Sequence, residues 1–409
     1  MEAAAPARAL PGFLSAFGFR GYRVLWTGAF LSSVGTWTQD VALNWLIHER
    51  FLDPRYLGYR SFAADAPLIA FMVLGGAAAD RIDRRRILIA SQVLQMSFAA
   101  ALGLLYGAGR LSVFPIVLFA FLTGLAQSQS APTYQAVLTT LVPPAQIPSA
   151  VALNSLQFNL SRTIGPVLAG ILLVQAGAGW CFTVNVLSFL AVIVALRGIE
   201  IPSPGLARKE KLAATLLAGF RHVGRDPQLR LYMALAGAGS FLAFPLITYL
   251  PVIAGDVLRT GARGYSQLLA AFGCGAILGA LVTAHRGAAP ARGRALLAGF
   301  AAYGLATLAA VLAASQLVAM ALLFVSGVSL VTSFSILNSL VQESAPQEFR
   351  GRVVGIYGLC FRGGMPLGSL AAGFFVRAFG APYTLASLSA LLSLLAAGVA
   401  LRSRRIHAT

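Results

Sequence analysis

Apolar runs of about 20 residues recur along the whole chain, separated by short segments rich in Arg, Pro and Gly. A helix of about 20 apolar residues crosses the ~30 Å hydrocarbon core of a bilayer. These runs are too long and too uniformly apolar for the alternating strands of a membrane barrel, whereas helices satisfy their own backbone hydrogen bonds in lipid. The pattern therefore predicts an all-α polytopic membrane protein.

The runs number twelve, six in each half of the chain. The shortest break, residues 177–179, separates the fifth run from the sixth. An even number of crossings places both chain ends on the same side of the membrane. The expected spans are 24–47, 57–79, 87–107, 113–141, 150–177, 180–199, 231–253, 266–284, 295–314, 317–341, 353–375 and 383–401.

The longest polar stretch lies near the middle of the chain, between the sixth and seventh expected spans. It divides the sequence into residues 1–200 and 231–409, which we expect to form two pseudo-symmetric six-helix bundles joined by a cytoplasmic linker at 201–230. Two similar halves that meet at a central cavity are typical of secondary transporters.

A short repeat supports the division into halves. Arg162 and Pro166, four residues apart in the fifth expected span, are matched by Arg362 and Pro366 in the eleventh. Pro-containing loops precede both spans. The repeat predicts that the fifth and eleventh helices occupy equivalent places in the two bundles.

The distribution of positive charge predicts the orientation. Of the 31 Lys and Arg residues, 22 lie in the segments on the same side as the two chain ends. Positively charged loops remain in the cytoplasm, so we expect both termini inside. This arrangement also accounts for the formal net charge of +18, so nucleic acid is not expected as a partner.

A signature follows the second expected span. Its positions match the pattern Gly-x-x-x-Asp-Arg/Lys-x-Gly-x-Arg/Lys-Arg/Lys, except that an Asp replaces the second Gly. Gly permits close helix packing, Asp can face a positive helix N-terminus, and Arg anchors a loop at the membrane surface. An ordinary positively charged loop would explain the Arg residues alone. The positions are Gly76, Asp80, Arg81, Asp83, Arg85 and Arg86.

This signature resembles the loop between the second and third helices of the major facilitator superfamily. The resemblance implies the major facilitator fold of twelve transmembrane helices and alternating access. It also implies that Asp80 helps to latch the two halves by facing the start of the eleventh helix. Gly76, Asp80, Arg81, Arg85 and Arg86 would then form a conformational gate motif.

Further segments resemble one bacterial branch of the superfamily, which contains enterobactin-type siderophore exporters and drug-efflux proteins. The resemblance implies a multi-pass protein of the bacterial inner membrane that exports a small, partly apolar compound in exchange for protons, and we expect a monomer. Siderophore export, anionic metabolite export and uptake remain alternatives, because the motifs do not select a substrate. The segments are 35–39, 159–166, 179–185 and 366–368.

Three ionisable residues fall at similar depth inside the expected spans, and such residues are costly and therefore functional candidates. At ~1.5 Å per helical residue, Asp40, Asp65 and Arg162 lie roughly 21–25 Å from the inner edge. We hypothesise that Asp40 and Asp65 are proton-coupling carboxylates and that Arg162 is their partner. The alternatives are a hydrated Asp40 near the outer headgroups, a packing or gate contact for Asp65, and a structural tie for Arg162.

Arg362 lies near mid-membrane in a half without an acid inside a span. Its planar fork suits carboxylates and phosphates, so it is a candidate for an anionic substrate group. Hydrogen bonding to carbonyls near Pro366 is the alternative. Uncharged polar residues could line the same cavity or form interhelical hydrogen bonds, since a bare amide facing lipid is costly. The candidates are Gln127, Tyr134, Asn154, Tyr249 and Asn338.

Other functional classes find little support. The four His residues lie near loops or termini, and no catalytic grouping stands out, so no enzyme is expected. A phosphate-binding Gly-x-x-x-x-Gly-Lys-Ser/Thr loop does not occur, which argues against an ATP-driven pump. Three separated Cys residues give no metal site, and we expect no cofactor. A receptor function would not account for the loop signature or for the two similar halves, so we do not expect a receptor.

Overall fold

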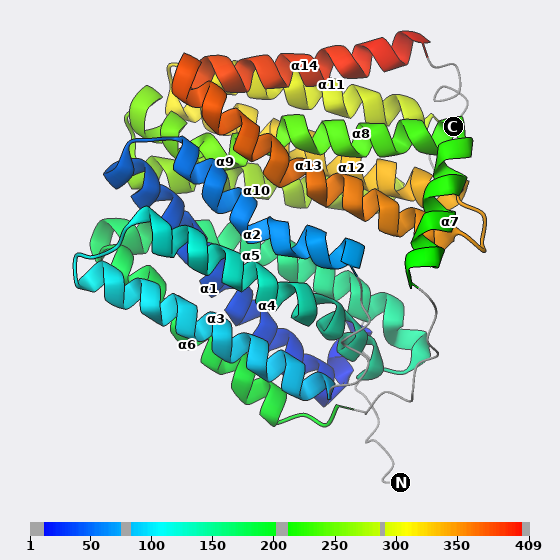
Figure 1. The fold of residues 1–409 in the computed structure, drawn as a ribbon, viewed down its shortest axis with the longest axis horizontal. Helices are drawn as coiled ribbons and strands as arrows, with labels where there is room; N and C mark the ends of the chain where they lie inside the picture. The colour runs from blue at the N-terminus through cyan, green and yellow to red at the C-terminus, as the bar shows by residue number, and fades with distance from the viewer. Residues whose placement is uncertain (1–11, 75–82, 202–211, 287–290, 403–409) are drawn as a thin grey trace.

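The computed structural model describes residues 12–74, 83–201, 212–286 and 291–402, and helices form nearly all of this part of the chain (Figure 1). Each of the twelve expected spans coincides with a helix or, for the seventh, with a broken helix. The prediction of an all-α polytopic fold is confirmed. The first six are α1 (Arg20–Phe51), α2 (Arg55–Leu74), α3 (Arg84–Gly107), α4 (Val113–Thr140), α5 (Ile147–Gln175) and α6 (Ala178–Arg197). The second six are α8 (Pro227–Ala243) with α9 (Pro245–Val252) and the π-helical turn η4 (Ile253–Val257), α10 (Gly261–Arg286), α11 (Arg292–Val311), α12 (Gln316–Ser344), α13 (Arg350–Phe379) and α14 (Ala381–Arg402).

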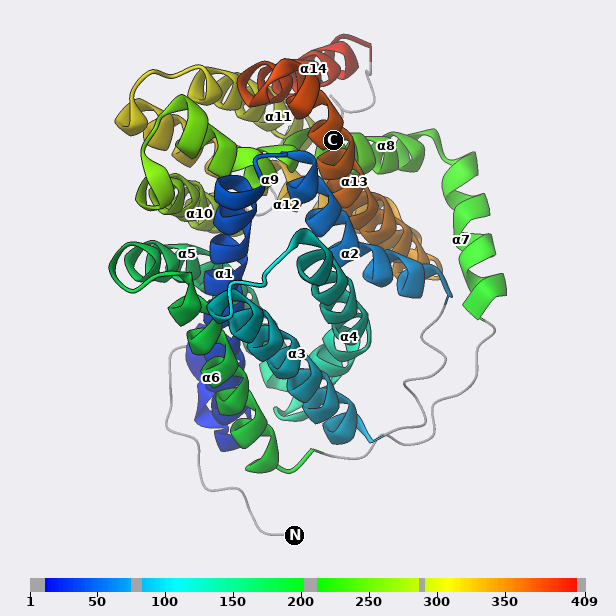
Figure 2. The same ribbon diagram turned by 60° about the vertical axis from the view of Figure 1, so that its left-hand side comes forward.

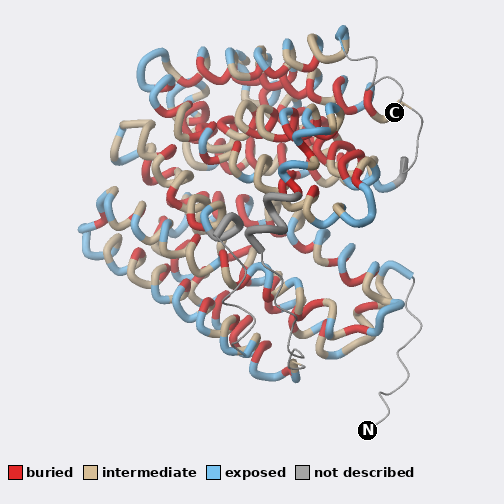
Figure 3. The backbone as a smooth tube through the Cα atoms, turned by 45° about the vertical axis from the view of Figure 1, so that its right-hand side comes forward, coloured by how far each residue is buried: buried red, intermediate tan, exposed pale blue. Residues whose placement is uncertain are grey.

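Ten helices of the described chain are long and apolar enough to cross a membrane. The helices α1 and α2 occupy the two other expected positions. Large apolar side chains on the outward faces are exposed, including Leu104, Phe114 and Leu317, each about three-quarters accessible. Buried residues instead follow the seams between helices (Figure 3), as expected for a bundle whose outer surface is solvated by lipid.

The helices pack in two groups. In the first, α1 packs against α5 and α6, α3 against α4 and α6, and α2 against α4. In the second, α8 packs against α13, α11 against α12 and α14, and α10 against α12. We call α1–α6 the N-terminal group and α8–α14 the C-terminal group.

Two pairs of helices join the groups: α2 packs against α13, and α5 packs against α10 (Figure 2). We call these the α2–α13 seam and the α5–α10 seam. An added methyl at Gly58 would lie 3.2 Å from the Cα atom of Leu370, and one at Gly170 would lie 2.6 Å from the Cβ atom of Ser266. Glycines at both seams therefore let the helices approach closely.

The two ends of the bundle differ. We call the end with the α1–α2 connection the Asp53 end and the opposite one, where α7 lies, the α7 end (Figure 1). Within the described residues, both ion pairs that join the two groups are at the Asp53 end: Arg377 with Asp53, and His48 with Asp256. The groups are thus held together at the Asp53 end.

Local sequence explains several helix boundaries. Asp83 begins α3 by accepting a hydrogen bond from the backbone N–H of Arg85 at 2.9 Å, and Asp226 begins α8 in the same way. Gly177 and Gly380 have φ of 83° and 84° and join α5 to α6 and α13 to α14. A residue with a side chain adopts this backbone only with strain, so a single glycine suffices for each short connection. The two glycines hold equivalent positions in the two halves, in agreement with the internal similarity of the sequence.

The expected linker contains a helix that the sequence analysis did not predict. This helix, α7 (Leu212–Arg225), packs against α13. The imidazole ring of His222 stacks on the ring of Phe349 with centroids 4.6 Å apart, and an added methyl at Gly219 would lie 3.0 Å from the Cβ atom of Arg352. The second part of the linker is therefore attached to the C-terminal group.

Candidate functional site

An ion pair inside the N-terminal group joins α1 to α2. Arg60 binds Asp40 through Nη2 and donates a hydrogen bond through Nη1 to Oδ1 of Asn44 at 2.8 Å. The Arg60 Nε atom is buried without a hydrogen-bond partner in the described structure. The expectation that Arg162 is the partner of Asp40 is therefore wrong for this conformation, because α2 supplies a nearer cation.

Asp65 of α2 and Arg362 of α13 lie at the same level of the α2–α13 seam. Both residues lie seven positions, two helical turns or about 10 Å, beyond the crossing of Gly58 with Ser369, toward the α7 end. Because α2 and α13 run in opposite directions, these offsets bring the two side chains to one level. Arg362, Asp40 and Arg60 all lie within electrostatic reach of Asp65. Asp65 is half-buried and Arg362 is exposed, and the described structure shows no direct ion pair between these two residues.

Tyr265 brings the C-terminal group to the same cluster. Its hydroxyl lies within electrostatic reach of Asn44, Arg60 and Asp40. Its ring stacks on the ring of Trp45 in α1, with centroids 6.4 Å apart. The cluster thus combines two carboxylates, two guanidinium groups and a phenol from four helices, α1, α2, α10 and α13.

Arg162 lies apart from this cluster, in the α5–α10 seam. Its guanidinium carbon is 5.7 Å from the ring centroid of Trp37 and 5.5 Å from that of Phe272. The described residues provide it with no ion pair or hydrogen bond, and its Nε atom is buried and unsatisfied. The expectation that Arg162 is also the partner of Asp65 is likewise not met, because Arg362 and Arg60 are the cations near that carboxylate.

The uncharged cavity candidates do not gather at one place. Tyr249 is fully buried and donates to the backbone carbonyl of Ser369, so in this conformation it packs in the α2–α13 seam. The other candidates lie at least partly accessible in their own helices, and three of them form interhelical or local hydrogen bonds. Gln127 donates to Gln95, Tyr134 donates to Gln157, Asn338 accepts from Gln342, and Asn154 is half-buried.

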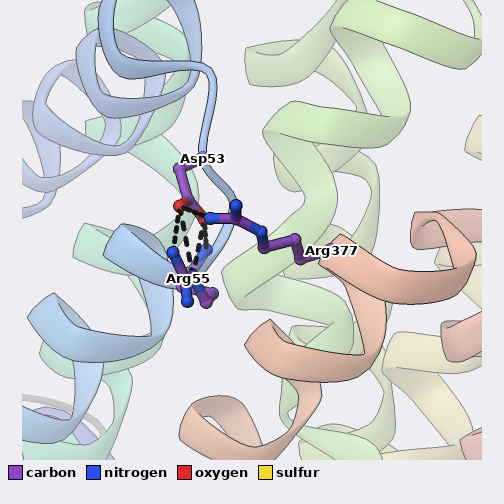
Figure 4. A network of polar contacts seen from close by, with 3 residues as sticks. All are labelled: Asp53, Arg55 and Arg377. Atoms are coloured by element: carbon purple, nitrogen blue, oxygen red, sulfur yellow. Dashed lines mark hydrogen bonds and ion pairs between the residues drawn. The ribbon is translucent and has the colours of Figure 1, made fainter.

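An ion-pair network closes the Asp53 end (Figure 4). Asp53, in the connection between α1 and α2, accepts hydrogen bonds from the Nη2 atom of Arg55 at 2.8 Å and from its backbone N–H at 3.0 Å. Arg377 at the end of α13 binds the same carboxylate from the C-terminal group. The side-chain hydrogen bond from Arg55 is the main reason why the pKa of Asp53 is lowered, and the charge of Arg377 adds to it.

Part of the predicted gate motif lies outside the described residues: Gly76, Asp80 and Arg81. Of the remaining positions, Arg85 is half-buried and donates to the backbone carbonyl of Ile199, beyond the end of α6. Arg86 is exposed. Arg85 therefore ties the start of α3 to the segment after α6 within the N-terminal group.

An apolar cavity of about 570 Å³ lies between α2, α4 and α13. Its walls include Tyr59, Phe62, Phe121 and Phe374, and no residue of the charged cluster lines it. The rings of Tyr59 and Phe374 meet with centroids 6.2 Å apart. This cavity is suited to apolar groups, and none of the predicted cavity residues takes part in it.

The sequence analysis missed Arg60, Asn44 and Tyr265 as members of the site. Arg60 lies inside the expected second span, and this intramembrane position was the available signal. Asn44 is four residues after Asp40 and so on the same face of α1. Tyr265 carried no signal, because only tertiary packing brings α10 beside α1.

The chain matches the family model described as transmembrane secretion effector over residues 12–409. It is 27% identical to the multidrug efflux pump Tap of Mycolicibacterium fortuitum over 382 residues, which cover 90% of this chain and 92% of Tap. It is 26% identical to the enterobactin exporter EntS of Escherichia coli over 347 residues, covering 82% of this chain and 80% of EntS. The staphyloferrin A transporter of Staphylococcus aureus is 30% identical over 178 residues, 42% of this chain and 44% of that transporter.

Solved structures show the same fold. A bacterial homologue of the human lysosomal transporter Spinster superposes with a TM-score of 0.75 at 16% sequence identity, covering 95% of this chain and 97% of that one. The arrangement of twelve helices in α1–α6 and α8–α14 therefore matches that of a solved transporter. The resemblance drawn from the loop signature and from the segments of the bacterial branch is confirmed.

Proposed function

Because this chain belongs to the transmembrane secretion effector family of the major facilitator superfamily, we propose that it exports a small, partly apolar compound in exchange for protons. The family and the relatives are transporters and not enzymes, so the protein is a membrane transporter with a small-molecule substrate. The proposal specifies the direction of transport, the coupling ion and the residues that couple this ion to transport. It places the protein in the bacterial inner membrane as a monomer with both termini in the cytoplasm.

The observation that carries the proposal is the charged cluster across the α2–α13 seam. Asp65 belongs to the N-terminal group, and Arg362, a cation within its electrostatic reach, belongs to the C-terminal group. A relative movement of the two groups would therefore change the charge that Asp65 experiences. A carboxylate whose charge environment depends on conformation can couple proton binding to that conformation.

The proton step follows from the groups that surround Asp65. Arg362, Arg60 and Asp40 lie near Asp65. A neighbouring guanidinium group favours the ionised form of a carboxylate, whereas burial and a neighbouring carboxylate oppose it. Separation of α13 from α2 would remove Arg362 and favour uptake of a proton by Asp65. The return of Arg362 would favour release. Asp40 is already paired with Arg60 inside one group, so its environment would change less, and we assign it a supporting role.

Alternating access would use the Asp53 end as one gate. In the described conformation, the ion pairs of Asp53 and His48 and the close packing at Gly58 hold the groups together at this end. Opening to the predicted outside would break these contacts, while the gate motif around Asp80 would latch the α7 end. The names of the relatives, a multidrug efflux pump and an enterobactin exporter, support export as the direction.

Everted membrane vesicles test the proposal without a labelled substrate. A respiration-generated pH gradient quenches acridine orange, and a compound exchanged for protons restores the fluorescence. Vesicles with the wild-type protein should respond to members of a panel of amphipathic dyes and carboxylates. Asp65→Asn should lose the response but retain exchange of the same compound without a gradient. Asp226→Asn, a surface cap that Asn also satisfies, is the matched control.

Two results would contradict this assignment. A gradient-driven response that persists in Asp65→Asn would remove Asp65 from the coupling step. Compound movement that is driven by ATP and insensitive to the pH gradient in the wild-type protein would remove proton coupling altogether.

A further inference from the structure

The α2–α13 seam and the α5–α10 seam are equivalent in the two halves. Arg362 and Pro366 of α13 correspond to Arg162 and Pro166 of α5 by sequence. The packing agrees with this correspondence. An added methyl at Gly58 of α2 would meet Leu370, eight residues after Arg362, whereas one at Gly170, eight residues after Arg162, would meet Ser266 of α10.

This correspondence assigns a counterpart to Asp65. Gly58 of α2 and Ser266 of α10 take equivalent places, and seven residues further along lie Asp65 and Gly273 respectively. An added methyl at Gly273 would lie 2.8 Å from the Thr163 Oγ1 atom and 3.5 Å from the Arg162 carbonyl. Gly273 therefore packs against the backbone of Arg162 and Thr163, at the level that Asp65 takes in the other seam. One seam contains an Arg with a carboxylate, and the other an Arg with a glycine.

The missing carboxylate leaves Arg162 without an anion. Its Nε atom is buried and has no hydrogen-bond partner among the described residues, and its guanidinium group lies over the faces of Trp37 and Phe272. A cation–π contact contributes less than a direct ion pair with a carboxylate in a desolvated site. A cation held this way inside a bundle is a receptor for an anion, because a buried charge is stable only when it is compensated.

We propose that Arg162 binds an oxyanion, a carboxylate or a group of similar shape, carried by the exported compound. The anion would take the place that the Asp65 carboxylate takes in the other seam, and an aromatic or apolar body would lie on Trp37 and Phe272. These two rings come from opposite groups of helices, so a bound compound contacts both halves. This inference rests on the proposed transport function and specifies its substrate class.

The assignment differs from the one that the sequence favoured, in which Arg362 received the anion. Arg362 already has the Asp65 carboxylate within electrostatic reach across the seam. The two arginines thus have different roles: Arg362 acts with the proton-carrying residue, and Arg162 binds the substrate. A bound anion at Arg162 and a proton at Asp65 would each lie in one of the two equivalent seams between the groups.

Equilibrium binding to the full chain in nanodiscs tests the site without any gradient. The probes are 1-naphthoate and 1-naphthamide, which share an aromatic body and differ in charge, and the binding is measured by titration calorimetry. The wild-type protein should bind the carboxylate at least about tenfold more tightly than the amide. Arg162→Gln should abolish this preference while Arg162→Lys retains part of it. Arg110→Gln, on the connection between α3 and α4, should behave as wild type.

A substitution in α10 tests the same site. Gly273→Asp would supply the missing carboxylate and pair with Arg162, so it should lower the affinity for 1-naphthoate by about tenfold or more with Arg162 intact. Gly273→Ala controls for the added volume and should retain the preference, because the nearest atom is a rotatable hydroxyl. Should Gly273→Ala fail to fold, the comparison of Arg162→Gln with Arg162→Lys decides alone.

The inference is overturned if the wild-type protein shows no preference for the carboxylate, or if the preference survives in Arg162→Gln. These outcomes are separate from failure of the transport proposal. A protein that exchanges neutral or cationic compounds for protons would refute only the anion site. One that binds 1-naphthoate through Arg162 but ignores the pH gradient would refute only the coupling.

Discussion

Tyr249 in α9 donates its hydroxyl to the backbone carbonyl of Ser369 in α13 at 2.8 Å, directly beside Gly58 of α2. An added methyl at Gly58 would lie 2.7 Å from the Tyr249 hydroxyl and 2.9 Å from the Ser369 carbonyl. Three helices from both groups thus meet at one point with no room for a further atom. Asp65 and Arg362 each lie seven residues along their helices from this point.

Gly58→Ala should open this contact. The new methyl meets a backbone carbonyl that cannot move aside, so we expect a loss of about 1–3 kcal/mol and a lower midpoint of thermal unfolding in nanodiscs. Gly355→Ala in α13 is the control, because nothing lies within 4 Å of its added methyl, and it should be neutral or slightly stabilising. Equal effects of the two substitutions would show that the α2–α13 seam is not close-packed at Gly58.

Tyr249→Phe should weaken the same point more gently. The substitution removes a buried hydrogen bond and leaves the Ser369 carbonyl without this donor, which costs about 1 kcal/mol. Tyr383→Phe, on an exposed side chain of α14, should leave the unfolding midpoint unchanged. If Tyr249 instead lines the substrate site, its substitution would alter affinity for transported compounds while leaving the unfolding midpoint in place.

The Asp53 network should make closure of the Asp53 end depend on pH. The pKa of Asp53 is lowered when Arg55 and Arg377 bind it, so its contribution is fully present above the usual carboxyl pKa of about 4. It is lost as the pH falls through the lowered value. Because Arg377 is about half exposed, the effect should be at most about 1 kcal/mol.

Distances between spin labels on the two groups at the Asp53 end measure this closure. The wild-type protein should keep the short distance down to about pH 4 and lose part of it below. Asp53→Asn should show a reduced closed fraction at neutral pH and little change on acidification. Glu348→Gln, an exposed carboxyl between α12 and α13, should follow the wild-type curve. A pH-independent closed fraction in the wild-type protein would contradict the prediction.

Asp65 and Arg362 should be energetically coupled. Removal of Arg362 leaves the half-buried Asp65 carboxylate less well compensated, so Arg362→Gln should lower the unfolding midpoint, whereas Arg362 is exposed and Asp65→Asn should lower it less. The double variant should be more stable than the sum of the single effects predicts, by about 1 kcal/mol or more. The same cycle between Arg162 and Asp65 should give a coupling near zero, and a larger value there would restore the pairing expected from the sequence.

Several features of the protein follow from local sequence. The apolar runs predict the helices because each span must be about 20 residues long and satisfy its own backbone, which makes length and composition sufficient. The breaks at Gly177 and Gly380 and the cap at Asp83 are equally local. The spacing of the loop signature predicted the family, because each position acts within one turn of helix or one short loop.

The partners of the intramembrane charges depended on the tertiary structure. Similar depth along the chain indicated that Asp40, Asp65 and Arg162 could meet, but depth does not state which face of a helix points at which neighbour. Helix rotation and crossing are set by close contacts between distant segments, such as Gly58 with Ser369 and Gly273 with Thr163. Those contacts place Asp40 beside Arg60 and bring Arg362 near Asp65. Among the described residues they leave Arg162 without a carboxylate, and its neighbour in α10 is Gly273.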